Sequence, residues 1–408
     1  MNDRLDTRFA SLLALTVLAN MGVGIVMPVL PLYFEHHDVS VAGLGLPFVT
    51  LVAGRLASRA GVARVIERLG HRHVVMAAFL IYAVVFFLYL AAGSLHVFAA
   101  LRFGEGIVEG VLAVALNDLA IAYTKGSAAE VRVRAMGRFS AAFGLGFLLG
   151  PLAGSVVAYF WGLPAIFIAA GVLGLGAVLV TARFIVDAPA AASSTAATDR
   201  LVGVGLLIGL YSPQFLRRLV FFSLMILLPL HAHDRLRLAP EAVGLFFSAS
   251  AVITTAVMPF AAIVAKRVGA ERMVRAGLFV MIVALALFAV PDTVAGFAAL
   301  FLVETFAFAL MLPPAMSIFG DAIDNQVKRT QLLGVMAFVT EIASLPLAAI
   351  LPACYAASPA AAWSAVAVVA AAALAAFVGA RRRLVQAMPV SGAIDAGSGV
   401  PAVSRIGR

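Results

Sequence analysis

Twelve long apolar runs, separated by proline, glycine and charged residues, constrain the fold of this chain more than any other feature. The sequence has 408 residues, of which 63% are apolar and 12% are charged, and its mean hydropathy is +1.07. Such a chain has too little polar surface to cover a water-soluble globule. Each run is close to the roughly 20 residues that cross a hydrocarbon core. We therefore predict an all-α membrane protein with transmembrane helices at about residues 9–34, 42–66, 73–92, 96–123, 136–159, 164–184, 214–231, 241–264, 273–291, 293–316, 331–353 and 357–380.

The basic residues predict how these helices are oriented. Most of the 29 lysine and arginine residues fall at the N-terminus, in alternate loops and in the C-terminal tail, whereas the opposite loops hold only Arg235 and Arg237. Because basic residues are enriched on the cytoplasmic side, we expect a multi-pass protein of the cell (inner) membrane with both termini in the cytoplasm. The net charge of +9 follows from this topology and from contact with anionic lipid, so no nucleic-acid partner is predicted.

A polar linker divides the predicted helices into two sets of six. We predict an N-terminal bundle at residues 1–185, a linker at 186–213 with a segment that could lie at the membrane interface, a C-terminal bundle at 214–383, and a disordered cytoplasmic tail at 384–408. Two pseudo-symmetric six-helix bundles around a central cavity are a transporter architecture, in which substrate binds near the midplane.

The fifth predicted helix carries a glycine-rich face made of Gly146, Gly150, Pro151 and Gly154. Glycines four residues apart let two helix backbones approach closely in lipid, and proline removes a backbone donor and bends the helix. A bent and closely packed seam is what a rocking membrane protein needs, so we assign these residues to conformational change.

The fourth predicted helix carries three charged residues, Arg102, Glu105 and Glu109, on one face that spans about 60°. Asn117 flanks this face. An ionised side chain in hydrocarbon costs about 2.5–3.5 kcal/mol or more and must face a cavity or a partner. Two neighbouring carboxylates do not both ionise readily, so one can hold a proton. We predict that this trio couples transport to protons, with Glu105 as first choice; a fixed buried ion pair and a substrate role are the alternatives.

Four more charged residues lie deep in predicted helices. Arg55 and Arg59 share a face of the second helix, and Glu304 and Glu341 are the deep carboxylates of the second half. Charges inside the membrane rarely face lipid, so we expect all four to line the cavity or contact substrate, and either Glu304 or Glu341 could read a cationic substrate or a proton. Asn117 joins this set because it flanks the charged face of the fourth helix. For the two arginines, snorkelling toward the cytoplasm is the alternative.

Several of these motifs resemble those of the major facilitator superfamily, and within it the twelve-helix drug and metabolite proton antiporters. The first helix, from Gly22 to Pro31, is similar to the opening helix of that family, and the stretch Arg102-x-x-Glu105-Gly106 resembles its Arg-x-x-Gln-Gly motif. The family associates the glycine-rich face of the fifth helix with antiporters rather than symporters.

The loop after the second helix resembles the family signature Gly-x-Leu-Ala-Asp-Arg-x-Gly-Arg-Arg, with Ala63, Glu67 and His71 as departures. A carboxylate at Glu67 can accept from backbone donors at a helix N-terminus and pair with Arg68 or Arg134, which would lock the cytoplasmic side. The alternative is that the arginines are ordinary cytoplasmic charges. The predicted gating residues in this region are Glu67, Arg68, Gly70, Arg72 and Arg134.

Together, these features predict a secondary active transporter that works by alternating access. The resemblance favours proton-coupled efflux of small hydrophobic or amphipathic compounds such as drugs or metabolites; a facilitator or proton symporter of a sugar or an organic anion is the alternative. No catalytic triad or nucleotide-binding motif is present, so we predict no enzyme activity and no cofactor, with the proton gradient as energy source. The expected partners of a monomer are a small-molecule substrate, protons and the bilayer, and a single cysteine excludes a cysteine-based metal site.

Overall fold

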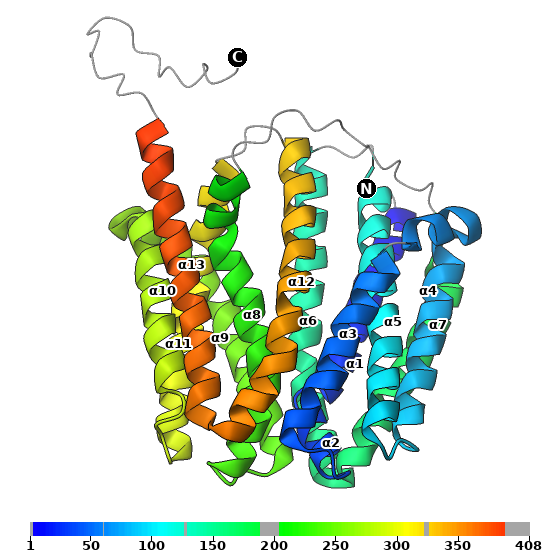
Figure 1. Ribbon diagram of the computed structural model, residues 1–408. Coiled ribbons are helices and arrows are strands. Elements are labelled where there is room, and N and C mark those ends of the chain that lie inside the picture. The colour runs from blue at the N-terminus through cyan, green and yellow to red at the C-terminus, as the bar shows by residue number, and fades with distance from the viewer. Residues whose placement is uncertain (1–2, 60, 126–128, 188–203, 322–325, 388–408) are drawn as a thin grey trace, which may run out of the picture.

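The computed structural model describes residues 3–59, 61–125, 129–187, 204–321 and 326–387. Within these residues, twelve long helices, one short helix and one 3-10 turn run along the chain, with the long helices side by side (Figure 1). In order they are α1 (Asp3–Val26), α2 (Leu30–Glu35), η1 (Val41–Leu44), α3 (Gly45–Arg59), α4 (Val62–Tyr89), α5 (Leu95–Tyr123), α6 (Ala129–Trp161), α7 (Leu163–Phe184), α8 (Val204–Asp234), α9 (Pro240–Val268), α10 (Ala270–Leu287), α11 (Val294–Asp321), α12 (Gln326–Ala357) and α13 (Pro359–Ala387).

The helices confirm an all-α membrane protein. Eleven segments of the described chain are long and apolar enough to cross a bilayer, and each covers all or most of a different long helix. The remaining long helix, α10, has 18 residues and carries Glu271, Arg272 and Arg275 near its start.

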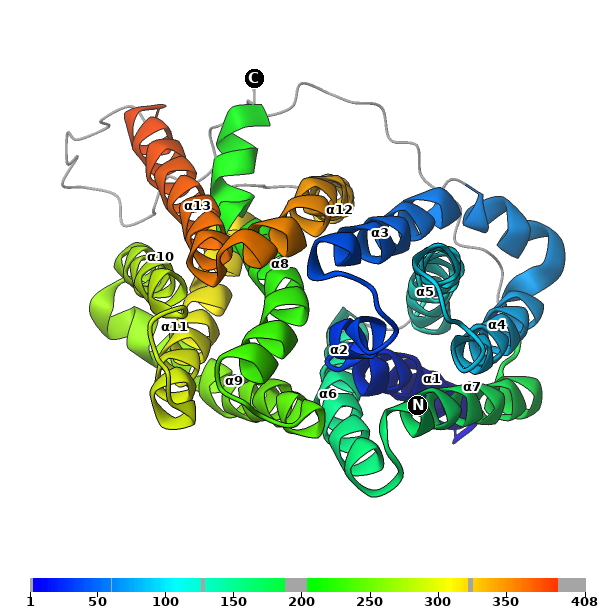
Figure 2. The same ribbon diagram turned by 60° about the horizontal axis from the view of Figure 1, so that its bottom comes forward.

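Two bundles of six long helices lie side by side, α1 to α7 in one and α8 to α13 in the other (Figure 2). Inside the first bundle α1 packs against α6 and α3 against α5, and inside the second α8 packs against α13 and α10 against α11. The bundles meet where α3 packs on α12 and where α6 packs on α9. We call the end where α1 begins and α13 finishes the terminal end of the bundle (Figure 1). The residue bounds given above for the two halves stay a prediction, because residues 188–203 and 388–408 lie outside the described part of the chain.

Prolines explain why the first predicted helix, 9–34, is divided. α1 ends at Val26, and α2 begins at Leu30. Pro28 and Pro31 lie at this break, and a proline cannot donate a backbone hydrogen bond to the preceding turn. The chain therefore turns between residues 27 and 29 before it continues as a short helix at the end opposite the termini.

The second predicted helix is shorter than expected. α3 ends at Arg59, and residues 62–69, part of which we assigned to that helix, belong to α4 instead. Gly70 interrupts α4 with φ 79° and ψ 159°. Glycine tolerates this conformation because it has no Cβ. The predicted loop at Glu67 to Arg72 is therefore a helical segment that bends sharply at Gly70.

The expected start of the seventh helix at residue 214 is wrong, because α8 begins at Val204 and continues through Pro213. Pro213 cannot donate to the carbonyl of Gly209, but the hydroxyl of Ser212 donates to that oxygen at 2.7 Å and to Ala373 at 2.9 Å. A serine can thus replace the missing backbone donor and keep the helix intact. Most of the apolar stretch before Pro213 is therefore helix, and the last helix, α13, continues to Ala387.

Candidate functional site

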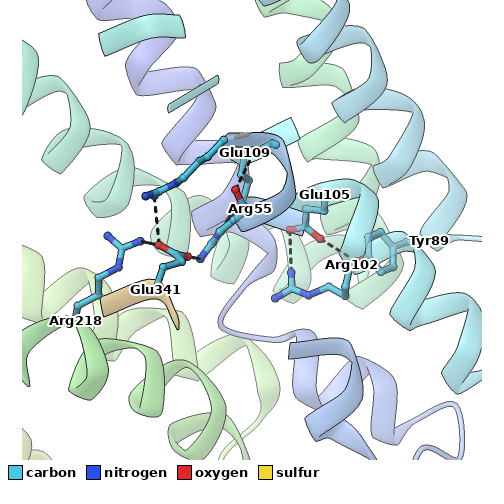
Figure 3. A network of polar contacts seen from close by, with 9 residues as sticks. Arg55, Tyr89, Arg102, Glu105, Glu109, Arg218 and Glu341 are labelled. Carbon is cyan, nitrogen blue, oxygen red and sulfur yellow. Dashed lines mark hydrogen bonds and ion pairs between the residues drawn. The ribbon is translucent and has the colours of Figure 1, made fainter. Parts of the chain in front are cut away.

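One group of polar side chains is buried in the first bundle and has its hydrogen-bond partners there. Arg102 donates from Nη1 to Glu105 Oε1 at 2.9 Å, and the hydroxyl of Tyr89 donates to Glu105 Oε2 at 2.8 Å. The side chains of Arg102 and Glu105 are 1% and 2% exposed, and the guanidinium of Arg102 lies 5.4 Å from the ring centre of Phe48. We call Tyr89, Arg102 and Glu105 the intrabundle cluster (Figure 3).

Glu109, one turn further along α5, is paired with a different arginine. Its Oε2 accepts from Nε of Arg55 on α3 at 2.6 Å, while Oε1 is buried and has no hydrogen-bond partner among the described residues. Figure 3 shows Glu109 on the other side of Glu105 from Arg102. The charges that we grouped as one trio are therefore divided between two sets of partners.

Glu341 of α12 joins Arg55 to the second bundle. Its carboxylate lies 2.6 Å from Nη2 of Arg218, which belongs to α8 of the same bundle. It lies 3.5 Å from Nη1 of Arg55, and also 3.5 Å from Nη2 of Arg59, across the boundary between bundles. We call Arg55, Arg59, Glu109, Arg218 and Glu341 the bridging cluster; all of them except Arg59 are labelled in Figure 3.

The distances in the bridging cluster separate tight contacts from loose ones. Arg55 with Glu109 and Arg218 with Glu341 are short pairs inside one bundle each, whereas both contacts that cross the boundary measure 3.5 Å. Protein hydrogen bonds from nitrogen to oxygen are usually about 2.7–3.2 Å. The bundles are thus held at this point by weak contacts that can change while each bundle keeps its own ion pair.

In the bridging cluster the side chain of Glu341 is buried, whereas those of two arginines are partly exposed. The side chain of Glu341 is 2% exposed, but those of Arg59 and Arg218 are 30% and 49% exposed. The cluster holds three arginines against two carboxylates. Solvent therefore reaches a site with a surplus positive charge between the bundles.

Contacts between the bundles also occur at the end opposite the termini. A Cβ added to Gly45 at the start of α3 would lie 2.8 Å from the carbonyl oxygen of Ala349, and the hydroxyl of Ser248 donates to the carbonyl of Leu148 at 3.1 Å. Figure 1 shows α3 and α12 close together toward that end and further apart toward the terminal end. The protein is therefore in a state whose two halves meet at the opposite end.

The glycine-rich face of α6 forms a tight seam with α1, as predicted for close backbone packing. A Cβ added to Gly146 would lie 2.7 Å from the carbonyl oxygen of Val17, and one added to Gly150 would lie 2.6 Å from that of Met21. Side chains larger than hydrogen therefore do not fit here without movement. Three neighbouring contacts extend the packing: Gly154 with Ile25, Gly24 with Pro151, and Pro151 with Gly244 of α9 in the other bundle.

The predicted gating residues at the terminal end do not form the expected lock in this state. Glu67, Arg68 and Arg134 are exposed, and no ion pair joins them in the described part of the chain. Arg72 instead donates its backbone N–H to Oδ1 of Asp187 at 2.8 Å, and a Cβ on Gly70 would lie 2.6 Å from that oxygen. The gating role of these residues stays a prediction.

Two predicted cavity residues lie outside both clusters. Asn117 is exposed on α5, and Glu304 is 5% exposed on α11, where no ion pair with another described residue reaches it. Conversely, sequence reasoning missed Tyr89, Arg218 and Asp187. Arg218 had a usable signal, because it lies well inside the apolar run once the helix is extended back to Val204. Nothing in the sequence pattern distinguished Tyr89 or Asp187.

Comparisons with known proteins agree on one family. The model of the Major Facilitator Superfamily matches residues 12–212 and 210–396. Multidrug resistance protein 2 of Bacillus subtilis (strain 168) is 26% identical over 155 residues, which are 38% of this chain and 38% of that protein. An uncharacterised MFS-type transporter of Methanocaldococcus jannaschii is 24% identical over 167 residues, 41% of this chain and 42% of that one. The chain thus matches about two fifths of the length of each relative.

Solved transporter structures share the whole fold. A bacterial homologue of the human lysosomal transporter Spinster, in an inward-facing and occupied conformation, gives a TM-score of 0.76 at 13% identity and covers 95% of this chain and 98% of its own. A point mutant of the nucleoside transporter NupG gives a TM-score of 0.73 at 15% identity, with 91% of this chain and 99% of its own covered. At these identities the likeness shows the fold alone.

Proposed function

This chain belongs to the Major Facilitator Superfamily, and we propose that it is a proton-coupled antiporter that exports small hydrophobic or amphipathic compounds. It is a secondary transporter that works by alternating access. The direction of transport is supported by the antiporter-type glycine face at Gly146 to Gly154 and by the partial match to a multidrug resistance protein. We further propose that it acts as a monomer in the cell (inner) membrane with both termini in the cytoplasm.

The observation that carries the coupling mechanism is the position of Arg55 between two carboxylates in different bundles. Arg55 is close to Glu109 at 2.6 Å and further from Glu341 at 3.5 Å. A proton on Glu109 removes the negative charge that holds Arg55, which is then attracted more strongly by Glu341. That shift draws the bundles together at the cluster and leaves less room for a compound between them.

Substrate acts on the same contacts in the opposite direction. A compound that enters beside the exposed side chains of Arg59 and Arg218 competes with the loose contacts that Arg55 and Arg59 make to Glu341. Arg55 then stays with ionised Glu109. Because substrate and proton favour different partners of one arginine, each can shift the population toward a different state. Exchange of substrate for protons requires such competition between the two.

The contacts favour Glu109 over Glu105 as the acid that carries the proton. Glu105 accepts from both Arg102 and Tyr89, and all three side chains are buried in one bundle. Glu109 has a buried Oε1 without a partner among the described residues, where a proton can be added without breaking a hydrogen bond. We therefore propose that Arg102 and Glu105 stabilise α5, and that Glu109, Arg55 and Glu341 couple proton and substrate.

Conformational change then involves the two ends of the bundle. We propose that the α1–α6 seam moves as a rigid unit, and that Glu67, Arg68, Gly70, Arg72 and Arg134 close the terminal end in the other state. That end is not closed by them in the state described here, in which Glu67 and Arg134 are exposed.

A second candidate is supported by the surplus positive charge of the bridging cluster. Three arginines against two carboxylates suit an organic anion better than a cation. If a proton on Glu109 released Arg55 to pair with the anion rather than with Glu341, the anion and the proton would be carried together. This is proton symport, and the direction of proton movement distinguishes it from antiport.

Reconstituted vesicles test the proposal. Uptake of neutral, anionic and cationic aromatic probes (naphthamide, naphthoate and naphthylmethylammonium) is measured with an imposed pH gradient, and a trapped pH dye records proton movement. Antiport predicts that at least one probe moves opposite to protons and that a protonophore stops its accumulation. Glu109→Gln should abolish accumulation but keep exchange at equal pH. Movement of probe and proton in the same direction, or accumulation by Glu109→Gln, would contradict the proposal.

A further inference from the structure

A second charged region, which shares no residue with the bridging cluster, surrounds a cavity of about 620 Å³. Its walls come from the last residues of α9, the first turns of α10, Ile318 of α11 and Arg381 of α13. These segments belong to the terminal end of the second bundle. The volume falls within the range of about 300–1,000 Å³ that is usual for small-molecule sites.

The cavity is lined by cations from three helices. The charged lining residues are Lys266, Arg267, Glu271, Arg272, Arg275 and Arg381. Five are basic and one is acidic, which leaves four positive charges around one hollow. Basic residues are expected in loops on the cytoplasmic side, but that rule does not require them to meet around a cavity. The convergence therefore calls for a local explanation.

Glu271 holds two of these arginines in place. Its Oε2 accepts from Nε and Nη2 of Arg381 at 3.1 and 3.0 Å, and its Oε1 lies 3.4 Å from Nη2 of Arg275. An arginine has five N–H donors, so each guanidinium keeps donors for a further acceptor. Lys266, Arg267 and Arg272 are exposed, and no ion pair with a described residue neutralises them. The site is thus partly ordered and still short of negative charge.

We propose that this cavity binds a phosphate group, and that the phosphate belongs to the headgroup of an anionic phospholipid. Arginine forks match the oxygens of phosphate in geometry and charge. The apolar side chains of Phe260 and Ile263 on α9 are 60% and 53% exposed, one to two turns below Lys266 and Arg267. They provide a surface along which an acyl chain can lie while the headgroup occupies the cavity. Free phosphate has the same headgroup chemistry but gains nothing from this apolar surface.

Thermal unfolding of the full chain in detergent tests the site. Phosphatidylglycerol should raise the unfolding midpoint of the wild type by several degrees relative to phosphatidylcholine. The triple variant Lys266→Gln, Arg267→Gln and Arg272→Gln should lose most of that rise. A matched control carries the same charge loss outside the cavity, at the exposed Arg64, Arg132 and Arg138, and should keep that rise. Equal loss in the control would mean that overall charge, not the cavity, attracts the lipid, and would overturn the proposal.

A parallel arm separates the two sources of phosphate. Inorganic phosphate is compared with chloride at equal ionic strength. A rise of the unfolding midpoint with phosphatidylglycerol alone supports a lipid headgroup. An equal rise of the midpoint with inorganic phosphate would contradict the lipid assignment. If the triple variant does not fold, Arg272→Gln alone is purified and its bound lipids are counted by mass spectrometry. It should retain several-fold less phosphatidylglycerol than Arg138→Gln, and equal retention, or no rise in the wild type, would overturn the site.

Discussion

Glu105 and Glu109 lie one helical turn apart on α5 but belong to clusters with different partners. Glu105 is held by Arg102 and Tyr89 inside one bundle at 2.9 and 2.8 Å. Glu109 is held by Arg55, whose Nη1 lies 3.5 Å from Glu341 across the boundary. The first arrangement has its contacts within one bundle, whereas the second spans both bundles. Two neighbouring carboxylates on one helix face can thus be paired in different ways, one inside a bundle and one at the boundary between bundles.

The largest expected effect comes from breaking the intrabundle cluster. Arg102→Leu leaves Glu105 buried without its cation, and loss of one partner of a buried ion pair typically costs about 3–5 kcal/mol. We expect a large fall in the yield of folded protein and in the unfolding midpoint in detergent. The double variant Arg102→Leu and Glu105→Leu should recover much of the loss. If Arg102→Leu unfolded like the wild type, the cluster would not be structural.

Next in size is the effect of neutralising Glu341. Glu341→Gln removes the charge that attracts Arg55 and Arg59 across the boundary and Arg218 within its own bundle. We expect at least about a tenfold loss of gradient-driven transport, equivalent to 1.4 kcal/mol, with a smaller loss of stability than Arg102→Leu because these arginines are partly exposed. Glu341→Asp should keep part of the transport. Transport by Glu341→Gln at the wild-type rate would remove the bridging cluster from the cycle.

The seam between α1 and α6 tests whether the first bundle moves as one body. Gly150→Leu should over-pack the seam, because its Cβ alone would lie 2.6 Å from the carbonyl oxygen of Met21. Over-packing costs about 1–3 kcal/mol, and we expect slower transport with a lower unfolding midpoint. Gly144→Leu is a matched control on the same helix, since nothing lies within 4 Å of a Cβ there. Full activity in Gly150→Leu, or equal loss in the control, would contradict a role for the seam.

A smaller effect concerns pH at the opposite end of the bundle, away from both clusters. Burial raises the pKa of Glu35, and the nearby carboxylate of Asp234 raises it further, while His233 lowers it. A carboxyl whose pKa is raised by folding is most favourable when protonated, so its contribution to this state increases as pH falls and is lost as pH rises through the raised pKa. Glu35→Gln should flatten this part of the pH dependence of the unfolding midpoint, and this effect is measured by thermal unfolding across a pH series. An unchanged pH profile in Glu35→Gln would show that the dependence arises elsewhere.

Much of the fold could be predicted from the sequence, because the apolar composition of a segment and the positions of its prolines influence that segment's own structure directly. The apolar runs located the long helices, and the glycines of α6 located a close backbone contact. Helix ends were less predictable, since Ser212 can compensate for Pro213 through a hydrogen bond that depends on the folded helix. A proline by itself therefore does not mark a helix end in this fold, and Pro229 and Pro259 also lie inside helices.

The candidate site was less predictable, because its pairing is set by tertiary structure. Helical spacing placed Arg102, Glu105 and Glu109 on one face, but only the position of α3 could show that Glu109 meets Arg55. Likewise, the sequence pattern did not single out Arg218, although α12 brings Glu341 to it at 2.6 Å. Deep charges could be found from the sequence, whereas their partners required the packing of four helices.

The most direct test of the difference between the two clusters compares Glu105→Gln with Glu109→Gln in the same vesicles. Both variants remove one carboxylate charge from α5, and the measured quantity is proton movement coupled to transport of the best naphthalene probe, per folded protein. The account predicts that Glu105→Gln, once folded, keeps coupled proton movement, and that Glu109→Gln loses it at least about tenfold, or 1.4 kcal/mol. Loss in Glu105→Gln with normal coupling in Glu109→Gln would contradict the account.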